Sequence, residues 1–317
     1  MFYRSKRSAC LLAAALFLLA APAFAQVPAD VAEKLREIGR ISEVPKTLAI
    51  YVPFHKEKAP YSGVKVVRDA KYGAHERQAL DVFMPENMSG SPRPVFIWVH
   101  GGAFVGGNKK SAQGAFFYDN VGVWAARNGM IGVNINFRLA PEHKWPTGAQ
   151  DTGTAVKWVI DNIASHGGDP TRIFLAGHSS GAVNVADYIA FPQFHAGPNG
   201  PGLKGAMLIS GAYNVAQYPA GPGPKAYYGD DASKYAERSS QPGLLKTIVP
   251  LFLAYAEHDV PNFANETKIL NEALCKAGKC PRLVELATHS HMSETLAINT
   301  GDTLLTGPIL DFVKTTK

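Results

Sequence analysis

Short apolar runs that alternate with helix-like stretches limit most strongly what this chain can fold into. The runs at residues 95–99 and 131–135 contain almost no polar side chains, as expected of strands buried on both faces. Similar runs recur at residues 64–68, 80–84, 173–176, 206–209, 250–256 and 283–286. Helical spacing or helix-boundary signals follow at residues 151–162, 180–190, 265–277 and 309–313. This alternation predicts an α/β fold with a mostly parallel sheet of about eight strands flanked by helices.

The alternation continues without a linker-like break, so we expect residues 26–317 to form one domain. Residues 26–60 are interpreted as a short N-terminal arm, with helical spacing at 29–38. The irregular stretch at 212–246 lies between two predicted strands. We expect it to be a surface excursion over a site, because long loops in compact domains are usually functional. No repeat of fixed length is present, which argues against solenoids and propellers.

The first 25 residues predict a cleaved export signal. They combine a positively charged start, an apolar run, and small residues at 23–25 that suit cleavage before Gln26. A transmembrane anchor is the alternative, but the run contains Pro22 and is marginal for hydrocarbon about 30 Å thick. We therefore expect a periplasmic or secreted protein with no stable membrane insertion after cleavage.

The charge balance excludes little beyond nucleic-acid binding. The formal charge is +6, and three of the basic residues lie in the predicted signal, which has no acidic residue. The small remainder does not indicate a nucleic-acid partner. We expect the pair Lys109-Lys110, the nearest approach to a basic run, to be solvated surface.

Three cysteines occur, and Cys10 belongs to the predicted signal. Two cysteines then remain in a protein expected in an oxidising compartment, which predicts one disulfide between Cys275 and Cys280. Because the disulfide closes a short loop, its expected stabilisation from chain entropy is only about 2 kcal/mol. Two free thiols are the alternative, and a metal site built from two cysteines alone is weaker still.

The most specific motif is G-H-S-S-G at 177–181, which follows a predicted strand and opens a predicted helix. In that setting Ser179 is held on a tight turn with its hydroxyl exposed, as a nucleophile is. Gly177 and Gly181 leave room where a Cβ would collide with neighbouring elements. The alternative is a glycine-rich connection that only needs to turn.

A second motif, H-G-G-A-F at 100–104, follows another predicted strand. Small residues there allow backbone N–H groups to face a cavity and bind the oxyanion of acyl transfer. The expected donors are the N–H groups of Gly102, Ala103 and Ser180, and losing one donor typically costs on the order of 3–4 kcal/mol.

A serine nucleophile needs a base, and the base needs an orienting acid. The order Ser, acid, His is the one expected for this type of sheet. Asp259, just past a predicted strand, is the first choice of acid and Glu257 the reserve. Either His289 or His291, past the last predicted strand, is the expected base.

A metal bound by the H-x-H pair is a weaker interpretation, because no carboxylate or cysteine is placed by sequence to complete the site. We therefore expect no metal and no cofactor. The remaining histidines singled out by the motifs, His143, His178 and His258, are expected to make local hydrogen bonds.

From about residue 64 to residue 313 the sequence resembles α/β-hydrolase carboxylesterases. The H-G-G-A-F motif resembles that of hormone-sensitive-lipase-like esterases and of feruloyl/acetyl (xylan) esterases and kynurenine formamidases, and N-F-R-L-A-P-E-H at 136–143 looks like a segment they share. Asp151, expected to open a helix, fits the same block. The resemblance selects His291, which precedes Met292 and a small polar residue, as the base.

Two departures favour the feruloyl/acetyl esterase and formamidase side of the family. Ala103 replaces a third glycine, and His178 stands where the lipase-like group usually has Asp. The short arm implies that no large cap is present, so an open, shallow site is expected.

The resemblance implies a serine carboxylic-ester hydrolase acting on small, short-acyl or aryl esters through Ser179, His291 and Asp259. Phe104 and Tyr213 are candidates for substrate binding. An arylformamidase using the same machinery is the alternative, and a non-catalytic binding protein of the same fold is less favoured.

Overall fold

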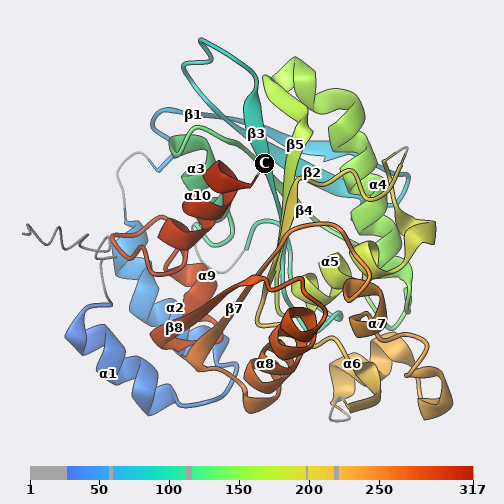
Figure 1. The fold of residues 1–317 in the computed structure, drawn as a ribbon. Coiled ribbons are helices and arrows are strands. Elements are labelled where there is room, and N and C mark those ends of the chain that lie inside the picture. The colour runs from blue at the N-terminus through green and yellow to red at the C-terminus, as the bar shows by residue number, and fades with distance from the viewer. Residues whose placement is uncertain (1–26, 57–59, 112–115, 198, 218–220, 317) are drawn as a thin grey trace, which may run out of the picture.

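The computed structural model describes residues 27–316 except 57–59, 112–115, 198 and 218–220 (Figure 1). The predicted export signal, with Cys10, therefore lies outside the described residues. Across the described ranges, no helix is both long and apolar enough to cross a bilayer.

Eight strands form one sheet in the order β1-β2-β4-β3-β5-β6-β7-β8. Strand β2 is antiparallel to both β1 and β4, and the other neighbouring pairs are parallel. The predicted mostly parallel sheet is thus confirmed. The strands are β1 (Val64–Lys71), β2 (Ala79–Pro85), β3 (Arg93–Val99), β4 (Ile131–Ile135), β5 (Gly168–His178), β6 (Gly205–Ile209), β7 (Leu251–His258) and β8 (Arg282–Ser290).

Helices cover both faces of the sheet. They are α1 (Ala29–Ile38), α2 (Val44–Tyr51), α3 (Asp119–Arg127), α4 (Thr147–Asn162), α5 (Ser180–Ala190), α6 (Pro222–Tyr228), α7 (Gln241–Leu244), α8 (Pro261–Lys276), α9 (Ser293–Leu296) and α10 (Thr306–Thr315). Figure 1 shows α3 and α10 on one side of the central strands and α4 and α5 on the other.

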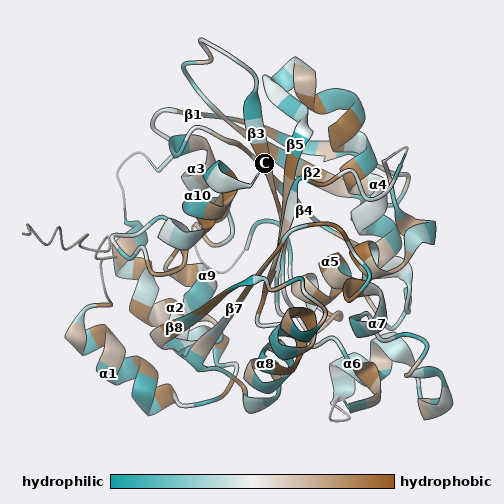
Figure 2. Ribbon diagram, viewed as in Figure 1, coloured by the Kyte–Doolittle hydropathy of each residue, from teal (hydrophilic) through white to brown (hydrophobic). Residues whose placement is uncertain are grey.

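The two faces carry separate apolar clusters because side chains alternate along each strand. Along β3, Val95, Ile97 and Val99 pack with α4, α5 and α8, whereas Phe96 and Trp98 pack with α1, α3 and α10. Helices α1 and α8 show both hydrophilic and hydrophobic residues along their length (Figure 2). The near-continuous apolar runs of the sequence are therefore strands buried on both faces.

Two local expectations are wrong. Asp151 lies inside α4, which begins at Thr147, and its carboxylate accepts from the Arg138 guanidinium at 2.7 Å. Lys109 is buried, with its ammonium 2.6 Å from an oxygen of Asp81 and 2.8 Å from one of Asp69. The lysine was expected at the surface because sequence alone does not show a carboxylate partner from a distant strand.

Candidate active site

Ser179 lies on the turn between β5 and α5, as predicted. Its φ of 57° and ψ of −126° are in a region that residues with side chains rarely adopt. Close packing holds the turn: a Cβ on Gly177 would lie 2.4 Å from the carbonyl oxygen of Gly181, and one on Gly181 would lie 2.2 Å from that of Val99. The two glycines are therefore required, and Ser179 is presented to a cavity that it lines.

Asp259 and His291 lie at the carboxyl ends of neighbouring parallel strands, β7 and β8. The distance from His291 Nδ1 to Asp259 Oδ1 is 2.8 Å, and both side chains are buried. The backbone N–H of Val260 also donates to Asp259 Oδ1, at 2.7 Å. The reserve acid, Glu257, instead accepts from the backbone N–H of Thr288.

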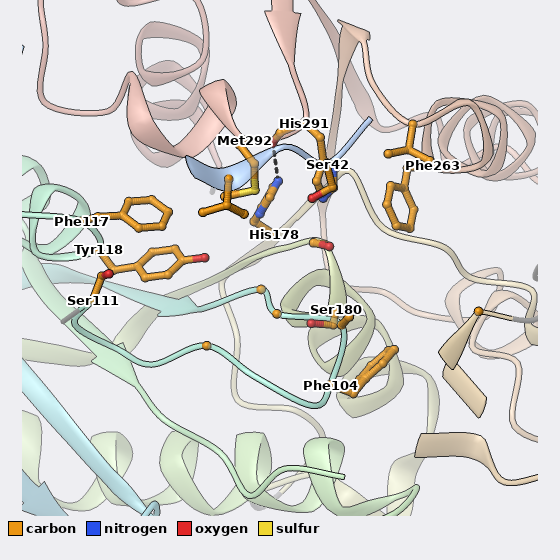
Figure 3. Close-up of a pocket in the computed structure, with 18 of the residues that line it drawn as sticks. Ser42, Phe104, Ser111, Phe117, Tyr118, His178, Ser180, Phe263, His291 and Met292 are labelled. Carbon is orange, nitrogen blue, oxygen red and sulfur yellow. Dashed lines mark hydrogen bonds between the residues drawn. The ribbon is translucent and has the colours of Figure 1, made fainter. Parts of the chain in front are cut away.

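The two candidate bases have different surroundings. His291 lines the same cavity as Ser179, and the ring of Phe263 stacks on its imidazole at 4.8 Å (Figure 3). His289 is buried elsewhere, with Nδ1 2.9 Å from Ser293 Oγ and Nε2 3.0 Å from Asp302 Oδ2. His289 therefore holds the turn after β8, and of the two candidate bases only His291 lines the cavity.

The H-x-H pair is not brought together as a metal site. Within the described ranges, the group of side chains whose ligand atoms lie close enough for a metal ion is His178, His291 and Glu294. His178 Nε2 is 2.8 Å from the backbone oxygen of His291, which agrees with the expected local role (Figure 3). Burial and the neighbouring His291 lower the pKa of His178 well below its usual value, so this imidazole is neutral.

The expected oxyanion donors line the cavity beside Ser179. Gly102, Ala103 and Phe104 have consecutive positive φ values of 136°, 51° and 66°. Ser180 is the first residue of α5, where backbone N–H groups have no partner within the helix. The small residues of this turn and the first residue of α5 therefore line the cavity together.

The loop that carries these donors is held at both ends. Burial lowers the pKa of the His100 imidazole to about 3, so it is neutral, and its ring stacks on Phe137 at 4.5 Å. At the other end, the backbone N–H of the buried Lys109 donates to the side-chain oxygen of Asn136 at 2.6 Å. These contacts anchor both ends of the loop.

The cavity has a volume of about 750 Å³, and segments far apart in the sequence contribute to its wall. Helix α2 packs against α9 and contributes Val44 and Leu48 to the wall, preceded by Ser42. The region predicted as an excursion contributes Gly221 and Pro224. Both chain segments therefore contribute to the wall of the site.

Aromatic side chains form much of the remaining wall. Phe104 lines the cavity and stacks on Tyr227 at 4.2 Å. Tyr213 is not among the lining residues: it is buried in the apolar cluster of α4, α5 and α8, so its expected contact with substrate is wrong. Phe117 and Tyr118, stacked at 3.9 Å, line the cavity but were missed, because nothing local in their sequence separates them from core aromatics.

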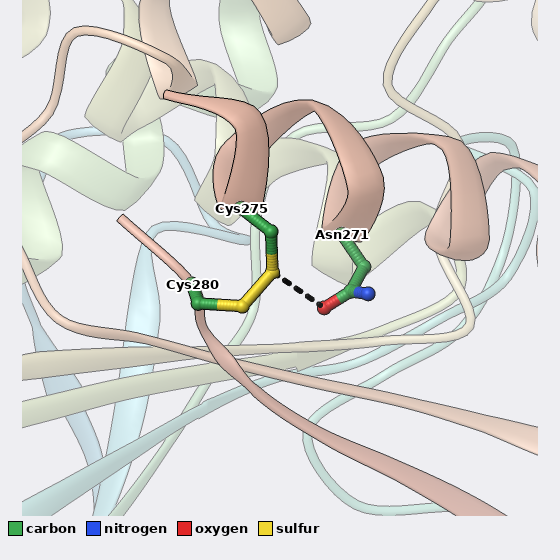
Figure 4. The surroundings of a disulfide bond; sticks show 3 residues. All are labelled: Asn271, Cys275 and Cys280. Atoms are coloured by element: carbon green, nitrogen blue, oxygen red, sulfur yellow. Dashed lines mark hydrogen bonds between the residues drawn. A yellow bond between two sulfur atoms is a disulfide. The ribbon is translucent and has the colours of Figure 1, made fainter. Parts of the chain in front are cut away.

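The predicted disulfide is present. Cys275, in the last turn of α8, is bonded to Cys280, just before β8 (Figure 4). It closes the short connection between this helix and the edge strand, away from the cavity-lining residues.

Comparisons with known proteins agree with this geometry. Residues 80–191, which include both glycine-rich motifs, match the BD-FAE family. A phenmedipham hydrolase from Pseudarthrobacter oxydans is 34% identical over 122 residues, 36% of this chain and 23% of that protein. The esterase LipC from Mycobacterium tuberculosis is 37% identical over 114 residues, 36% of this chain and 27% of that protein. The chain thus spans about a quarter of the length of these relatives.

Structural similarity extends much further along the chain. A hyperthermophilic esterase from Pyrobaculum calidifontis superposes with a TM-score of 0.67 at 22% identity, covering 92% of this chain and 98% of the other. At that identity the likeness concerns the fold. Together with the order of the strands and the serine turn after β5, it shows that this chain has the α/β-hydrolase fold.

Proposed function

We propose that this chain is a serine carboxylic-ester hydrolase in which Ser179 is the nucleophile, His291 the base and Asp259 the orienting acid. One observation carries the proposal: the imidazole bound to Asp259 at 2.8 Å lines the same cavity as a serine held at positive φ. A buried carboxylate on Nδ1 keeps the proton on that nitrogen and leaves Nε2 to accept the serine proton.

The reaction follows from these positions. Ser179 attacks the acyl carbon while His291 takes its proton and returns it to the leaving alcohol. The N–H groups of Gly102, Ala103 and Ser180 stabilise the oxyanion of the tetrahedral intermediate. Water activated by His291 then releases the acid, and the step requires no cofactor.

The side chains that line the cavity suit an uncharged substrate with apolar groups on both sides of the ester. Phe117 and Tyr118 lie on one side of His178, and Phe263 and Phe104 lie on the other (Figure 3). Among the described residues that line the cavity, none is Asp, Glu, Lys or Arg. The volume of about 750 Å³ lies within the range of small-molecule sites and exceeds what an acetyl group alone would fill. Small esters that carry a short acyl group or an aromatic group fit this description.

The same feature makes the arylformamidase alternative less favoured. A substrate such as N-formylkynurenine carries an ammonium and a carboxylate, and burying either without a partner is costly. The described lining residues offer no oppositely charged side chain to such a group.

Hydrolysis of a substrate panel tests the proposal. The wild type should hydrolyse p-nitrophenyl acetate and methyl ferulate, with little turnover of N-formylkynurenine. Ser179→Ala should lose this activity, whereas Ser165→Ala, which changes an exposed serine, should keep it. Preferential turnover of N-formylkynurenine would favour the formamidase. Absence of turnover on the whole panel would favour the binding protein.

We also propose that the protein is exported. The charged and apolar pattern of the first 25 residues supports this, as does the disulfide between Cys275 and Cys280, since disulfides persist in oxidising compartments. Protein recovered from the periplasm or medium should begin at Gln26. Protein that retains Met1 and stays in the cytoplasm would contradict the proposal.

A further inference from the structure

We propose that Glu294 is a protonated, neutral positioning residue that donates a hydrogen bond through Ser210 to the acid Asp259. The inference rests on the proposed hydrolase function and adds a group that no motif indicated. Glu294 lies three residues after His291, in α9, and its side chain is fully buried. It does not line the cavity, so it acts through other residues.

The contact to Asp259 runs through one hydroxyl group. Ser210 Oγ is 2.5 Å from Asp259 Oδ2 and 2.8 Å from Glu294 Oε1. Ser210 follows β6 with a φ of 50°, and its backbone N–H donates to the Ala254 carbonyl at 2.9 Å. A residue with a side chain in this conformation is strained, so surrounding contacts must hold its hydroxyl between the two carboxyl groups.

The number of protons available determines the charge of Glu294. A serine hydroxyl has one proton to donate. If both carboxyl groups were ionised, one of the two close contacts would place lone pairs against each other in a buried site. A proton on Glu294 Oε1 removes this conflict, because Glu294 then donates to Ser210 and Ser210 donates to Asp259. Burial and the neighbouring charge of Asp259 raise the pKa of Glu294 well above its usual value, which agrees with this arrangement.

The second oxygen of Glu294 extends the arrangement to the nucleophile turn. Glu294 Oε2 is 3.2 Å from Nε2 of His178, the residue before Ser179. The same nitrogen is 2.8 Å from the backbone oxygen of His291. A neutral His178 with its proton on Nε2 donates to the backbone oxygen of His291, and Glu294 Oε2 lies beside this N–H as a polar contact. Glu294 thus connects the elements that carry Ser179, Asp259 and His291.

The titratable groups around Glu294 come from three strand ends: His178 is the last residue of β5, Asp259 follows β7 and His291 follows β8. Glu294 and His178 carry no charge in this arrangement. An ionised Glu294 would add a second negative charge, favour protonation of the nearby imidazole, and move the acid limb of activity to higher pH. The charge of Glu294 is therefore measurable in a pH profile.

Substitutions at position 294 test the proposal. Glu294→Gln keeps the shape of the side chain, a donor for Ser210 and an oxygen beside His178, so its kcat should stay within about threefold of wild type and the acid limb of its pH profile should not move. Glu294→Met removes the hydrogen bond to Ser210, and its kcat should fall about tenfold or more with little change in KM, as for a lost buried hydrogen bond. In a Ser210→Ala background, Glu294→Met should cost almost nothing further. Thr295→Val, a buried change on the same turn, controls for loss of packing and should leave the profile unchanged.

The results that would overturn the proposal are distinct from failure of the hydrolase function. A Glu294→Gln enzyme whose acid limb shifts to lower pH, or whose kcat falls as far as that of Glu294→Met, would show that an ionised carboxylate is needed. If Glu294→Met does not fold, the Gln profile still decides. Infrared difference spectra of wild type and Glu294→Gln give a readout without turnover: a protonated-acid carbonyl band should be lost in the variant. Absence of that band would refute the proposal even if no ester is hydrolysed.

Discussion

Replacement of Gly102 by alanine should remove most of the activity while leaving the fold intact. Gly102 has a φ of 136°, and a Cβ placed on it would lie 2.2 Å from the carbonyl oxygen of Gly106. Real Cβ atoms essentially never approach closer than 3.0 Å, so the backbone of the loop must shift by nearly an ångström. The same loop carries the N–H groups of Gly102 and Ala103 that are proposed to bind the oxyanion.

The size of the effect follows from what those N–H groups do. Loss of one oxyanion donor costs about 2.7–4 kcal/mol, which corresponds to about a 100- to 1,000-fold decrease in kcat. KM should change little, since the donors act on charge that develops in the transition state. The assay is hydrolysis of p-nitrophenyl acetate, with thermal unfolding to verify that the variant is folded.

Gly106→Ala is the matched control in the same loop. A Cβ at Gly106 would lie 3.7 Å from its nearest neighbour, an ordinary contact, so its kcat should stay within about threefold of wild type. A Gly102→Ala enzyme with near-normal kcat would refute the assignment of this loop to the oxyanion. Equal losses in the two variants would show that the loop is sensitive to any added methyl group.

Three further predictions concern stability. Lys109→Met should lower the free energy of unfolding by about 3 kcal/mol, because it removes a buried partner of Asp81. Lys110 is half-exposed, so Lys110→Met should change the free energy of unfolding by about 0.5 kcal/mol or less. Urea unfolding of the two variants measures both values. Because the pKa of His100 is lowered to about 3 in the fold, the unfolded chain binds this proton first as pH falls, and stability is lost below the ordinary pKa of 6.5. Between about pH 7 and about pH 5 the free energy of unfolding should fall by about 2 kcal/mol because of His100. In His100→Gln, unfolding measured across this pH range should no longer show this decrease. Cys280→Ser should cost about 2 kcal/mol in non-reducing buffer and nothing once the wild type is reduced, whereas equal unfolding curves in non-reducing buffer would contradict a disulfide in solution.

The fold and the positions of the proposed catalytic residues could be predicted because their signals are local. A strand followed by G-H-S-S-G and a helix defines the turn of Ser179 within five residues. Asp259 and His291 follow apolar strands, and the carboxyl ends of parallel strands meet at one edge of a sheet. The position of each residue relative to a strand was therefore enough to predict that the three distant segments meet.

The walls of the cavity could not be predicted in this way. Leu48 reaches the site only because α2 packs on α9, and Tyr118 only through the placement of the segment before α3. An aromatic residue packs in a core as readily as it lines a cavity, and Tyr213 was assigned wrongly for that reason. Glu294 gave no signal at all, since its role depends on Ser210, which lies 84 residues away in the chain.

Mapping the site of reaction with a fluorophosphonate tests the central claim most directly. Wild-type protein should gain one phosphonyl adduct, located by mass spectrometry of its peptides on Ser179, and His291→Ala should label far more slowly than His289→Ala. An adduct on another residue, or ester hydrolysis that survives in Ser179→Ala, would contradict the proposed triad.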